Sequence, residues 1–208
     1  MKICLTSVLD LSDEPLCLSF GDKEEARLAS IENRERKKET LCALLALREL
    51  VGEKPLTIAR TPEGKPYFDT PDHLPFSLTH TEEWAAAALG DPHEGEVGID
   101  LELLRPYPQA EKVSVRFFTE DEQRDFSTFG KDAMAFFRVW TKKEAIAKLG
   151  GQGFLSEDQI IPAFCATYLL TRKETSLLLT VATKHPPKRI VWQTRKEDPN
   201  DFYIEELR

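Results

Sequence analysis

The chain has 208 residues, of which 41% are hydrophobic and 31% charged, as expected of a folded globular protein rather than a disordered or collagen-like one. Its net charge of −8 argues against a protein that binds nucleic acid over a broad basic surface. No apolar run approaches the roughly 18 residues that span a bilayer, and the N-terminal residues lack a signal peptide's apolar core. The 4 cysteines show no metal-ligand spacing, so we expect a cytoplasmic protein with free thiols.

The first half of the chain reads as a strand, a long helix and a group of strands. Residues 2–9 are mostly apolar and predict a strand. Residues 30–51 predict a helix that Ser30 caps and Gly52 ends. Residues 61–75 are rich in proline and glycine, which indicates turns. Short apolar runs then predict an antiparallel meander of three strands at 76–80, 84–89 and 97–101.

The second half repeats this order after a linker at 105–108. Two helices are predicted at 119–126 and 132–149, and two glycines stop the second one. We therefore predict an α+β fold with an N-terminal half at 1–104 and a C-terminal half at 105–208. Four further strands are predicted at 165–171, 176–183, 190–194 and 202–204.

Two carboxylates share one face of the predicted strand at 97–101, if the strand continues by one residue to position 102. Alternation places Asp100 and Glu102 opposite the apolar face of this strand. A hard cation such as Mg²⁺ would relieve the repulsion between them, since carboxylates are its preferred ligands. A solvated polar face explains the same pattern, so the strand alone leaves both interpretations open.

The helix at 132–149 carries a stripe of three side chains at a spacing of four residues. Trp140, Glu144 and Lys148 lie on one face. This stripe could supply a third carboxylate for a metal ion and a cation for a phosphate. Alternatively, Trp140 anchors the core and the other two residues form an exposed ion pair.

Three weaker signals lie elsewhere in the chain. His80 ends a strand beside a turn and could donate to a phosphate oxygen, and Lys65 sits in a rigid Gly-Lys-Pro turn. Thr119 and Glu122 fit a helix capping box, and Glu122 is a minor candidate for a general base. The chain contains no P-loop, GxGxxG, GxSxG or HExxH motif, which disfavours those chemistries.

The order of these blocks resembles the two-domain, surfactin-type 4′-phosphopantetheinyl transferases. The family pattern is approximately GKP, SH[ST], [IV]G[IV]D[IVL]E and [FW][ST]xKE[AS], with a lysine four residues after the glutamate. The chain matches it, in order, at Gly64-Lys65-Pro66, His80-Thr81, Val97-Gly98-Ile99-Asp100-Leu101-Glu102 and Trp140-Thr141-Lys142-Lys143-Glu144-Ala145 with Lys148.

The resemblance implies an enzyme that transfers the phosphopantetheine arm of coenzyme A to a serine of an apo acyl or peptidyl carrier protein. The other product is adenosine 3′,5′-bisphosphate. It also implies two similar halves related by a pseudo-twofold, with the active site in the cleft between them. Because one chain then supplies both halves, we expect a monomer.

The family's site residues transfer to this chain position by position. Asp100, Glu102 and Glu144 would hold Mg²⁺ against the pyrophosphate of coenzyme A, and Lys148 would neutralise its charge. Glu144 would also be the leading candidate for the base that removes the serine proton, with Glu122 second. The resemblance implies further contacts with coenzyme A from Lys65, Pro66, Thr79, His80, Thr40 and Arg27.

This chain departs from the family pattern at three positions. Ser77 stands where an asparagine is usual, and Thr79 replaces a serine but keeps a hydroxyl donor. Glu24 lies near the place of a family lysine, so contact with the 3′-phosphate would be weaker or would come from Arg34 or Lys38.

Two alternatives and one docking candidate stay open. The same acids could serve another Mg²⁺-dependent enzyme acting on a nucleotide or pyrophosphate, or the chain could be a coenzyme A or carrier-protein binding module without turnover. The aromatics Phe117, Phe118, Phe126 and Phe129 could form a docking patch or belong to the core.

Overall fold

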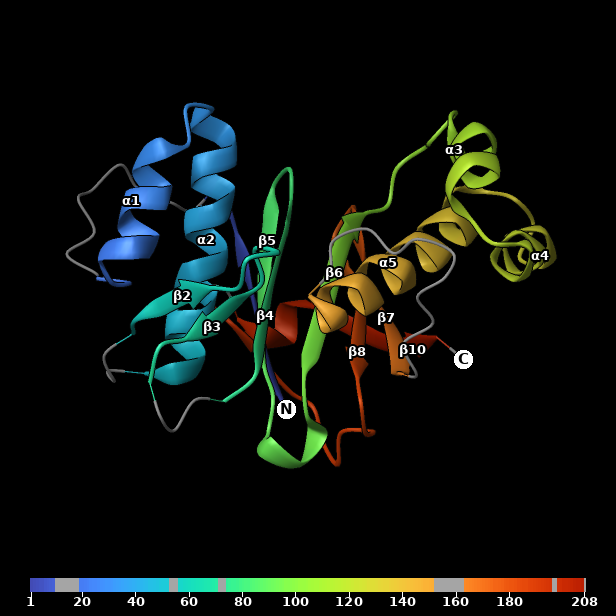
Figure 1. The fold of residues 1–208 in the computed structure, drawn as a ribbon. Coiled ribbons are helices and arrows are strands. Elements are labelled where there is room, and N and C mark those ends of the chain that lie inside the picture. The colour runs from blue at the N-terminus through green and yellow to red at the C-terminus, as the bar shows by residue number, and fades with distance from the viewer. Residues whose placement is uncertain (10–18, 53–55, 71–73, 152–162, 196–197, 208) are drawn as a thin grey trace.

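The protein is an α+β structure in which two sheets pack face to face between layers of helices. A computed structural model describes residues 1–9, 19–52, 56–70, 74–151, 163–195 and 198–207. Helices α1 and α2 lie on one side of the strands and α5 on the other (Figure 1). Side chains from both sheets share one core, which includes Ile3, Leu5, Ile99, Leu101, Leu177 and Leu179.

The first sheet is covered by a long helix on the face that points away from the second sheet. The strand order is β4-β5-β1-β9. Buried leucines of α2 (Arg34–Val51) pack against Cys4, Ala87 and Leu89 from this sheet. Its strands are β1 (Lys2–Ser7), β4 (Phe76–Thr81), β5 (Trp84–Leu89) and β9 (Val191–Thr194). The short helix α1 (Asp22–Ser30) and the two-stranded sheet of β2 (Ile58–Arg60) and β3 (Pro66–Phe68) complete this side.

The second sheet has the order β10-β7-β8-β6 and is covered by α5 (Ala133–Gly150). Its strands are β6 (Val97–Leu103), β7 (Phe164–Arg172), β8 (Thr175–Thr183) and β10 (Tyr203–Leu207). Helices α3 (Ala110–Phe117) and α4 (Glu120–Thr128) pack at the far end of α5, away from α1 and α2 (Figure 1).

The two sheets are built with the same connections. A strand leads through helices to a hairpin whose second strand pairs with that first strand, giving the orders β4-β5-β1 and β7-β8-β6. All of these pairings are antiparallel.

The expected meander of three strands in the first half is wrong in its third strand. β6 pairs with β8 over Val97–Leu103 and belongs to the second sheet. A strand from the second half takes the vacant place in the first sheet, since β9 pairs in parallel with β1. Sheet membership therefore does not follow the division at residue 105. Sequence proximity favoured the local pairing, and burial of β6 on both faces favours the observed one.

The predicted helix at 30–51 begins later than expected. Ser30 ends α1, where its hydroxyl donates to the Arg27 carbonyl, and Asn33 caps α2 by accepting from the Arg36 amide at 2.9 Å. Gly52 ends the helix as predicted, with a φ of 77°. The acidic first turn of α1, with Asp22, Glu24 and Glu25, is a helix signal that the sequence analysis missed.

The other predicted elements match the structure within a few residues. The capping box at α4 is confirmed, since Thr119 and Glu122 bond each other's backbone amides. α3, β2 and β3 were not predicted. Two of the four candidate docking aromatics, Phe118 and Phe126, are buried in the core, whereas Phe129 is 43% exposed. None of the described helices is both long and apolar enough to cross a membrane.

Candidate active site

The site depends on an unusually close approach between β6 and α5. Gly98 faces α5, and a Cβ atom added there would lie 1.9 Å from the Ala145 carbonyl oxygen and 2.6 Å from the Leu149 amide nitrogen. Only glycine therefore allows the helix to lie directly on the strand. Because Asp100 follows Gly98 on the same face, this contact places Asp100 beside the next turn of α5.

Asp100, Thr79 and Lys148 form a buried polar cluster at this contact. The Lys148 ammonium donates to Asp100 Oδ1 at 2.7 Å and to Thr79 Oγ1 at 3.1 Å. The Thr79 hydroxyl donates to Asp100 Oδ1 and accepts from the Leu101 amide, each at 3.2 Å. The other oxygen, Asp100 Oδ2, is buried without a hydrogen-bond partner in the part of the chain that the structure describes. An unpaired buried oxygen is costly and marks a place for a ligand.

Three carboxylates at this end of the site have raised pKa values. Burial raises the pKa of Asp100, although Lys148 and Thr79 oppose the shift. Burial and the charges of Asp100 and Glu144 raise the pKa of Glu102 to about 7. Burial and Asp100 likewise raise the pKa of Glu144. The carboxylates thus interact electrostatically, and a cation among them would relieve the repulsion.

The chemistry of these residues fits a magnesium ion, although they do not form a complete set of protein ligands. Among the described residues, no three His, Cys, Asp or Glu side chains are grouped closely enough to hold a metal by themselves. Mg²⁺ commonly takes only one or two carboxylates and completes its shell with water and substrate phosphate oxygens. The unpaired Asp100 Oδ2 and the mutual repulsion of the carboxylates fit that kind of site.

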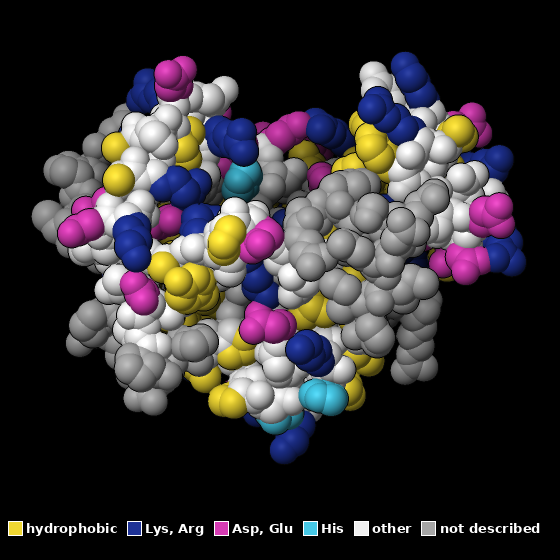
Figure 2. Space-filling model, in the orientation of Figure 1, with side chains coloured by type: hydrophobic (Ala, Val, Ile, Leu, Met, Phe, Trp, Pro, Cys, Tyr) yellow, Lys and Arg dark blue, Asp and Glu magenta, His cyan; other side chains and the backbone are white. Residues whose placement is uncertain are grey.

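A cavity of about 590 Å³ opens beside this cluster and extends toward α1 and α2. Glu144 and Lys148 of α5 line one wall, and four more cationic side chains come from the opposite elements. Figure 2 shows Lys and Arg side chains gathered on this face over α2 and β2. The residues that line the cavity include Arg27, Arg36, Thr40, Arg60, Glu63, Lys65, His80, Glu144 and Lys148.

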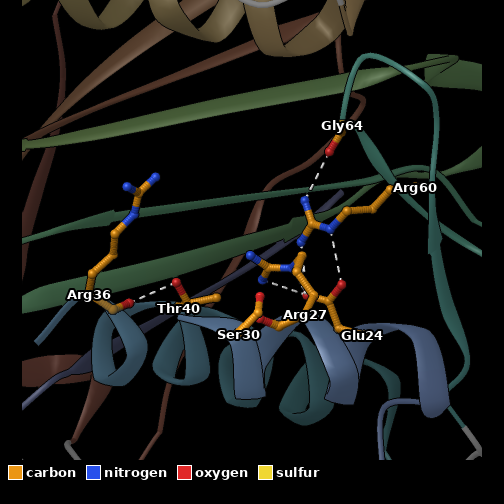
Figure 3. Close-up of polar contacts among 7 residues, drawn as sticks. All are labelled: Glu24, Arg27, Ser30, Arg36, Thr40, Arg60 and Gly64. Carbon is orange, nitrogen blue, oxygen red and sulfur yellow. Dashed lines mark hydrogen bonds and ion pairs between the residues drawn. The ribbon is translucent and has the colours of Figure 1, made fainter. Parts of the chain in front are cut away.

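The basic wall of the cavity is organised around Glu24, on which two arginines converge (Figure 3). The Glu24 side chain is only 1% exposed. Arg27 donates to it through Nε and Nη2, and Arg60 does the same from β2. Burial alone would raise the pKa of Glu24, but the hydrogen bonds and charges of Arg60 and Arg27 outweigh it and lower the pKa. Thr40 lies to one side, where its hydroxyl donates to the Arg36 carbonyl at 2.8 Å.

His80 links the two ends of the cavity. Its Nδ1 lies 3.2 Å from Glu39 Oε2. Burial and the charges of Lys148, Arg36 and Arg27 lower the pKa of His80 to about 4, so the ring is neutral at neutral pH. A neutral imidazole whose Nδ1 carries the proton toward Glu39 keeps Nε2 as an acceptor.

Comparison with known proteins agrees with this geometry. The family model of the 4′-phosphopantetheinyl transferase superfamily matches residues 96–200. The 4′-phosphopantetheinyl transferase AcpT of Salmonella typhi is 30% identical over 151 residues, covering 70% of this chain and 77% of that protein.

The chain belongs to the 4′-phosphopantetheinyl transferase superfamily. A putative 4′-phosphopantetheinyl transferase of Synechocystis sp. is 30% identical over 166 residues, covering 73% of this chain and 67% of that protein. The 4′-phosphopantetheinyl transferase psf-1 of Bacillus pumilus is 35% identical over 92 residues, covering 43% of this chain and 37% of that protein.

Some expected site residues of this phosphopantetheinyl transferase line the cavity, and others lie behind it. Lys65, Pro66, Thr40, Arg27, His80, Glu144 and Lys148 line it directly. Thr79 is only 3% exposed and holds Asp100 and Lys148 in place. The Lys65 ammonium contacts Glu96 and donates to the Leu149 carbonyl at 2.8 Å, so it holds the C-terminal end of α5.

Glu122 is held away from the cavity by other partners. Its carboxylate accepts from the Thr119 amide at 2.8 Å and pairs with Lys143 Nζ at 3.0 Å. Lys143 is buried and belongs to a different face of α5 than Glu144. The role of Glu122 as a base stays a prediction, and its contacts explain it as a helix cap and ion-pair partner.

Two residues of the site were missed in the sequence analysis, and two others were named there without their structural roles. Arg36 and Arg60 line the cavity, Glu24 orients two arginines, and Gly98 permits the approach of α5. The position of Glu24 was noted only as the loss of a basic residue. An acid three residues before an arginine, the spacing of a helical ion pair, was the available signal, but it does not reveal a partner in β2.

Proposed function

We propose that this chain transfers the 4′-phosphopantetheine group of coenzyme A to a serine hydroxyl of an apo carrier protein. The group of Asp100, Glu144 and Lys148 at one end of a cavity with a basic opposite wall carries this proposal. The relatives are named 4′-phosphopantetheinyl transferases, and the cavity offers cations for the phosphates of coenzyme A.

The reaction needs charge stabilisation and alignment more than covalent participation by the protein. The carrier serine oxygen forms a bond to the phosphorus that bears the pantetheine arm, and the pyrophosphate bond breaks to release adenosine 3′,5′-bisphosphate. Lys148, which lines the cavity, neutralises charge on the pyrophosphate. Glu144 takes the serine proton, directly or through a water molecule, because its carboxylate lines the cavity close to where the serine must enter.

We infer that Mg²⁺ is held by Asp100, Glu102 and Glu144 together with substrate oxygens. When bound there, the ion stabilises negative charge on the pyrophosphate. The support is the unpaired Asp100 Oδ2 and the raised pKa values of all three carboxylates. Thr79 keeps Asp100 oriented through a hydrogen bond. Lys148 donates to Asp100 and also lines the cavity, so it can contact the substrate there.

We also propose that two similar halves are related by a pseudo-twofold, with the site in the cleft between them. The shared connection order of β1-α2-β4-β5 and β6-α5-β7-β8 supports this arrangement. The division at residue 105 stays a prediction from the sequence. The monomeric state, the cytoplasmic location, the absence of nucleic-acid binding and docking of the carrier through the aromatics near Phe129 stay predictions from the sequence.

The test is to incubate the protein with coenzyme A, Mg²⁺ and an apo carrier protein and to weigh the intact carrier by mass spectrometry. A gain of one phosphopantetheine group that EDTA abolishes supports both the transfer and the metal. Glu144→Gln is expected to lower transfer nearly to background while the protein stays folded. Glu49→Gln, an exposed change of the same kind on α2, is the matched control and should retain activity.

Other outcomes would redirect the proposal. Near-normal turnover by folded Glu144→Gln would remove Glu144 from the mechanism. Hydrolysis of coenzyme A without any carrier would favour another Mg²⁺-dependent enzyme, and metal-independent binding without transfer would favour a binding module.

A further inference from the structure

Glu24 is a buried acid in the basic wall of the cavity, and simple electrostatics does not explain its position. A negative charge beside a phosphate site weakens phosphate binding. Yet Glu24 is 1% exposed and forms charged hydrogen bonds of 2.6 to 3.0 Å with both Arg27 and Arg60. Its carboxylate is therefore committed to these two guanidinium groups.

The arrangement fixes the direction of both arginines. Each uses Nε and Nη2 on Glu24, and Arg60 Nη1 also donates to the Gly64 carbonyl at 2.9 Å. Figure 3 shows the two guanidinium groups converging on Glu24 from α1 and β2. Without the acid, two adjacent cations would repel each other and sample many rotamers.

Binding capacity remains after these contacts. A guanidinium has five N–H donors, so the five hydrogen bonds within the described part of the chain use half of the donors of the pair. Both side chains line the cavity and are partly exposed, at 32% for Arg27 and 27% for Arg60. Arg36 lines the same wall and makes no ion pair among the described residues, so the wall keeps a net positive charge.

We propose that Glu24 is a positioning residue that holds Arg27 and Arg60 as a preorganised pair for a phosphate monoester of the substrate. This inference rests on the proposed function, in which the only monoester of coenzyme A is its 3′-phosphate. Preorganisation saves the ordering cost that two free arginines would incur on binding. Glu24 thereby favours substrates that carry this phosphate, although its own charge repels it.

The test compares coenzyme A with dephospho-coenzyme A, which lacks the 3′-phosphate, in steady-state transfer assays. Glu24→Gln keeps the shape but loses the charge. It is expected to raise KM for coenzyme A at least about tenfold, the scale of one charge-assisted hydrogen bond, with little change in kcat. KM for dephospho-coenzyme A should stay the same, so the preference of the enzyme for the phosphorylated substrate falls by the same factor.

Glu63→Gln is the matched control because Glu63 is an exposed acid that lines the same cavity. Removing its charge should lower KM for coenzyme A slightly, as Coulomb's law requires. If Glu24→Gln also lowers KM or leaves it unchanged, Glu24 acts only as a charge and the proposal is wrong. An equal rise of KM for both substrates would likewise overturn it, since a general structural defect is then sufficient.

Arg60→Lys provides a second test if Glu24→Gln does not fold, as judged by a thermal melt. Lysine keeps the charge but cannot form the two-pronged contact with Glu24. The same selective rise of KM is expected, and an unchanged KM would contradict the proposal. Wild-type turnover with coenzyme A is measured first, so that a failure of the proposed function is seen before any variant is compared. If the wild type shows no turnover, the preference for coenzyme A over dephospho-coenzyme A is measured by calorimetric binding instead.

Discussion

Glu24 and Asp100 are both buried carboxylates at the same cavity, but their surroundings shift their pKa values in opposite directions. Glu24 accepts hydrogen bonds from two arginines, and its pKa is lowered. Asp100 has one lysine and one threonine on Oδ1, no partner among the described residues on Oδ2, and a raised pKa. One carboxylate is saturated with cations, and the other is short of positive charge.

This difference indicates which kind of ligand each end of the cavity is built to receive. At the acidic end, burial and mutual repulsion disfavour the charged state of the carboxylates, so a cation gains free energy by binding there. At the basic end, the protein's own acid has already fixed the arginines, and their remaining donors face the cavity for an anion. A substrate that carries both a metal-binding pyrophosphate and a phosphate monoester suits both ends.

The largest expected effect comes from separating the acidic end from its helix. Gly98→Ala places a methyl group 1.9 Å from the Ala145 carbonyl oxygen, so α5 must move away from β6. We expect a loss of stability of about 3 kcal/mol in denaturant unfolding and transfer at background level. Ile99→Val, on the opposite face of the strand, should cost only about 1 kcal/mol and keep activity. Normal transfer by Gly98→Ala would show that the close contact is not required.

Asp100→Asn should break the acidic end while sparing the fold. The variant removes the charge that a metal ion needs, so we expect transfer to fall at least about a hundredfold. Because asparagine can still accept hydrogen bonds from Lys148 and Thr79, the unfolding free energy at pH 7 should fall by no more than about 2 kcal/mol. A large destabilisation without loss of transfer would show that Asp100 serves the fold and not the metal site.

Stability in acid should reveal the opposite character of the basic end. The folded pKa of Glu24 lies below its unfolded value, so its stabilisation is present above pH 4.5 and is lost as the pH falls through the folded pKa. Glu24→Gln should therefore lower the unfolding free energy by about 2 kcal/mol at pH 7 and by much less near pH 3. The check is urea unfolding at both pH values; equal losses would show that charge is not what Glu24 contributes.

The smallest effect should be a shift in the titration of His80. In the free protein its ring should stay neutral down to about pH 4, because burial, Lys148, Arg36 and Arg27 disfavour a further positive charge. Coenzyme A brings phosphate groups among these cations, so binding should raise the pKa of His80. NMR titration of the imidazole with and without coenzyme A measures this, with His80→Gln identifying the signal. A pKa that does not rise would place the phosphates elsewhere.

The sequence was informative where strand alternation or helix spacing alone decides on which face a side chain lies. Apolar alternation placed Asp100 and Glu102 on the face opposite the core, and the helix stripe brought Glu144 and Lys148 to one cavity wall. The pairing of β6 could not be read in this way, because a strand buried on both faces can pair with either neighbour. The contact between Glu24 and Arg60 joins positions 36 residues apart, and no local pattern encodes it.

The exchange of strands between the sheets has a consequence for the order of folding during synthesis. β1 is synthesised well before its parallel partner β9, which lies at Val191–Thr194. Until those residues leave the ribosome, one edge of β1 has open backbone groups that could pair with another chain. This edge of the first sheet therefore stays open during synthesis until β9 has been made and has paired with β1.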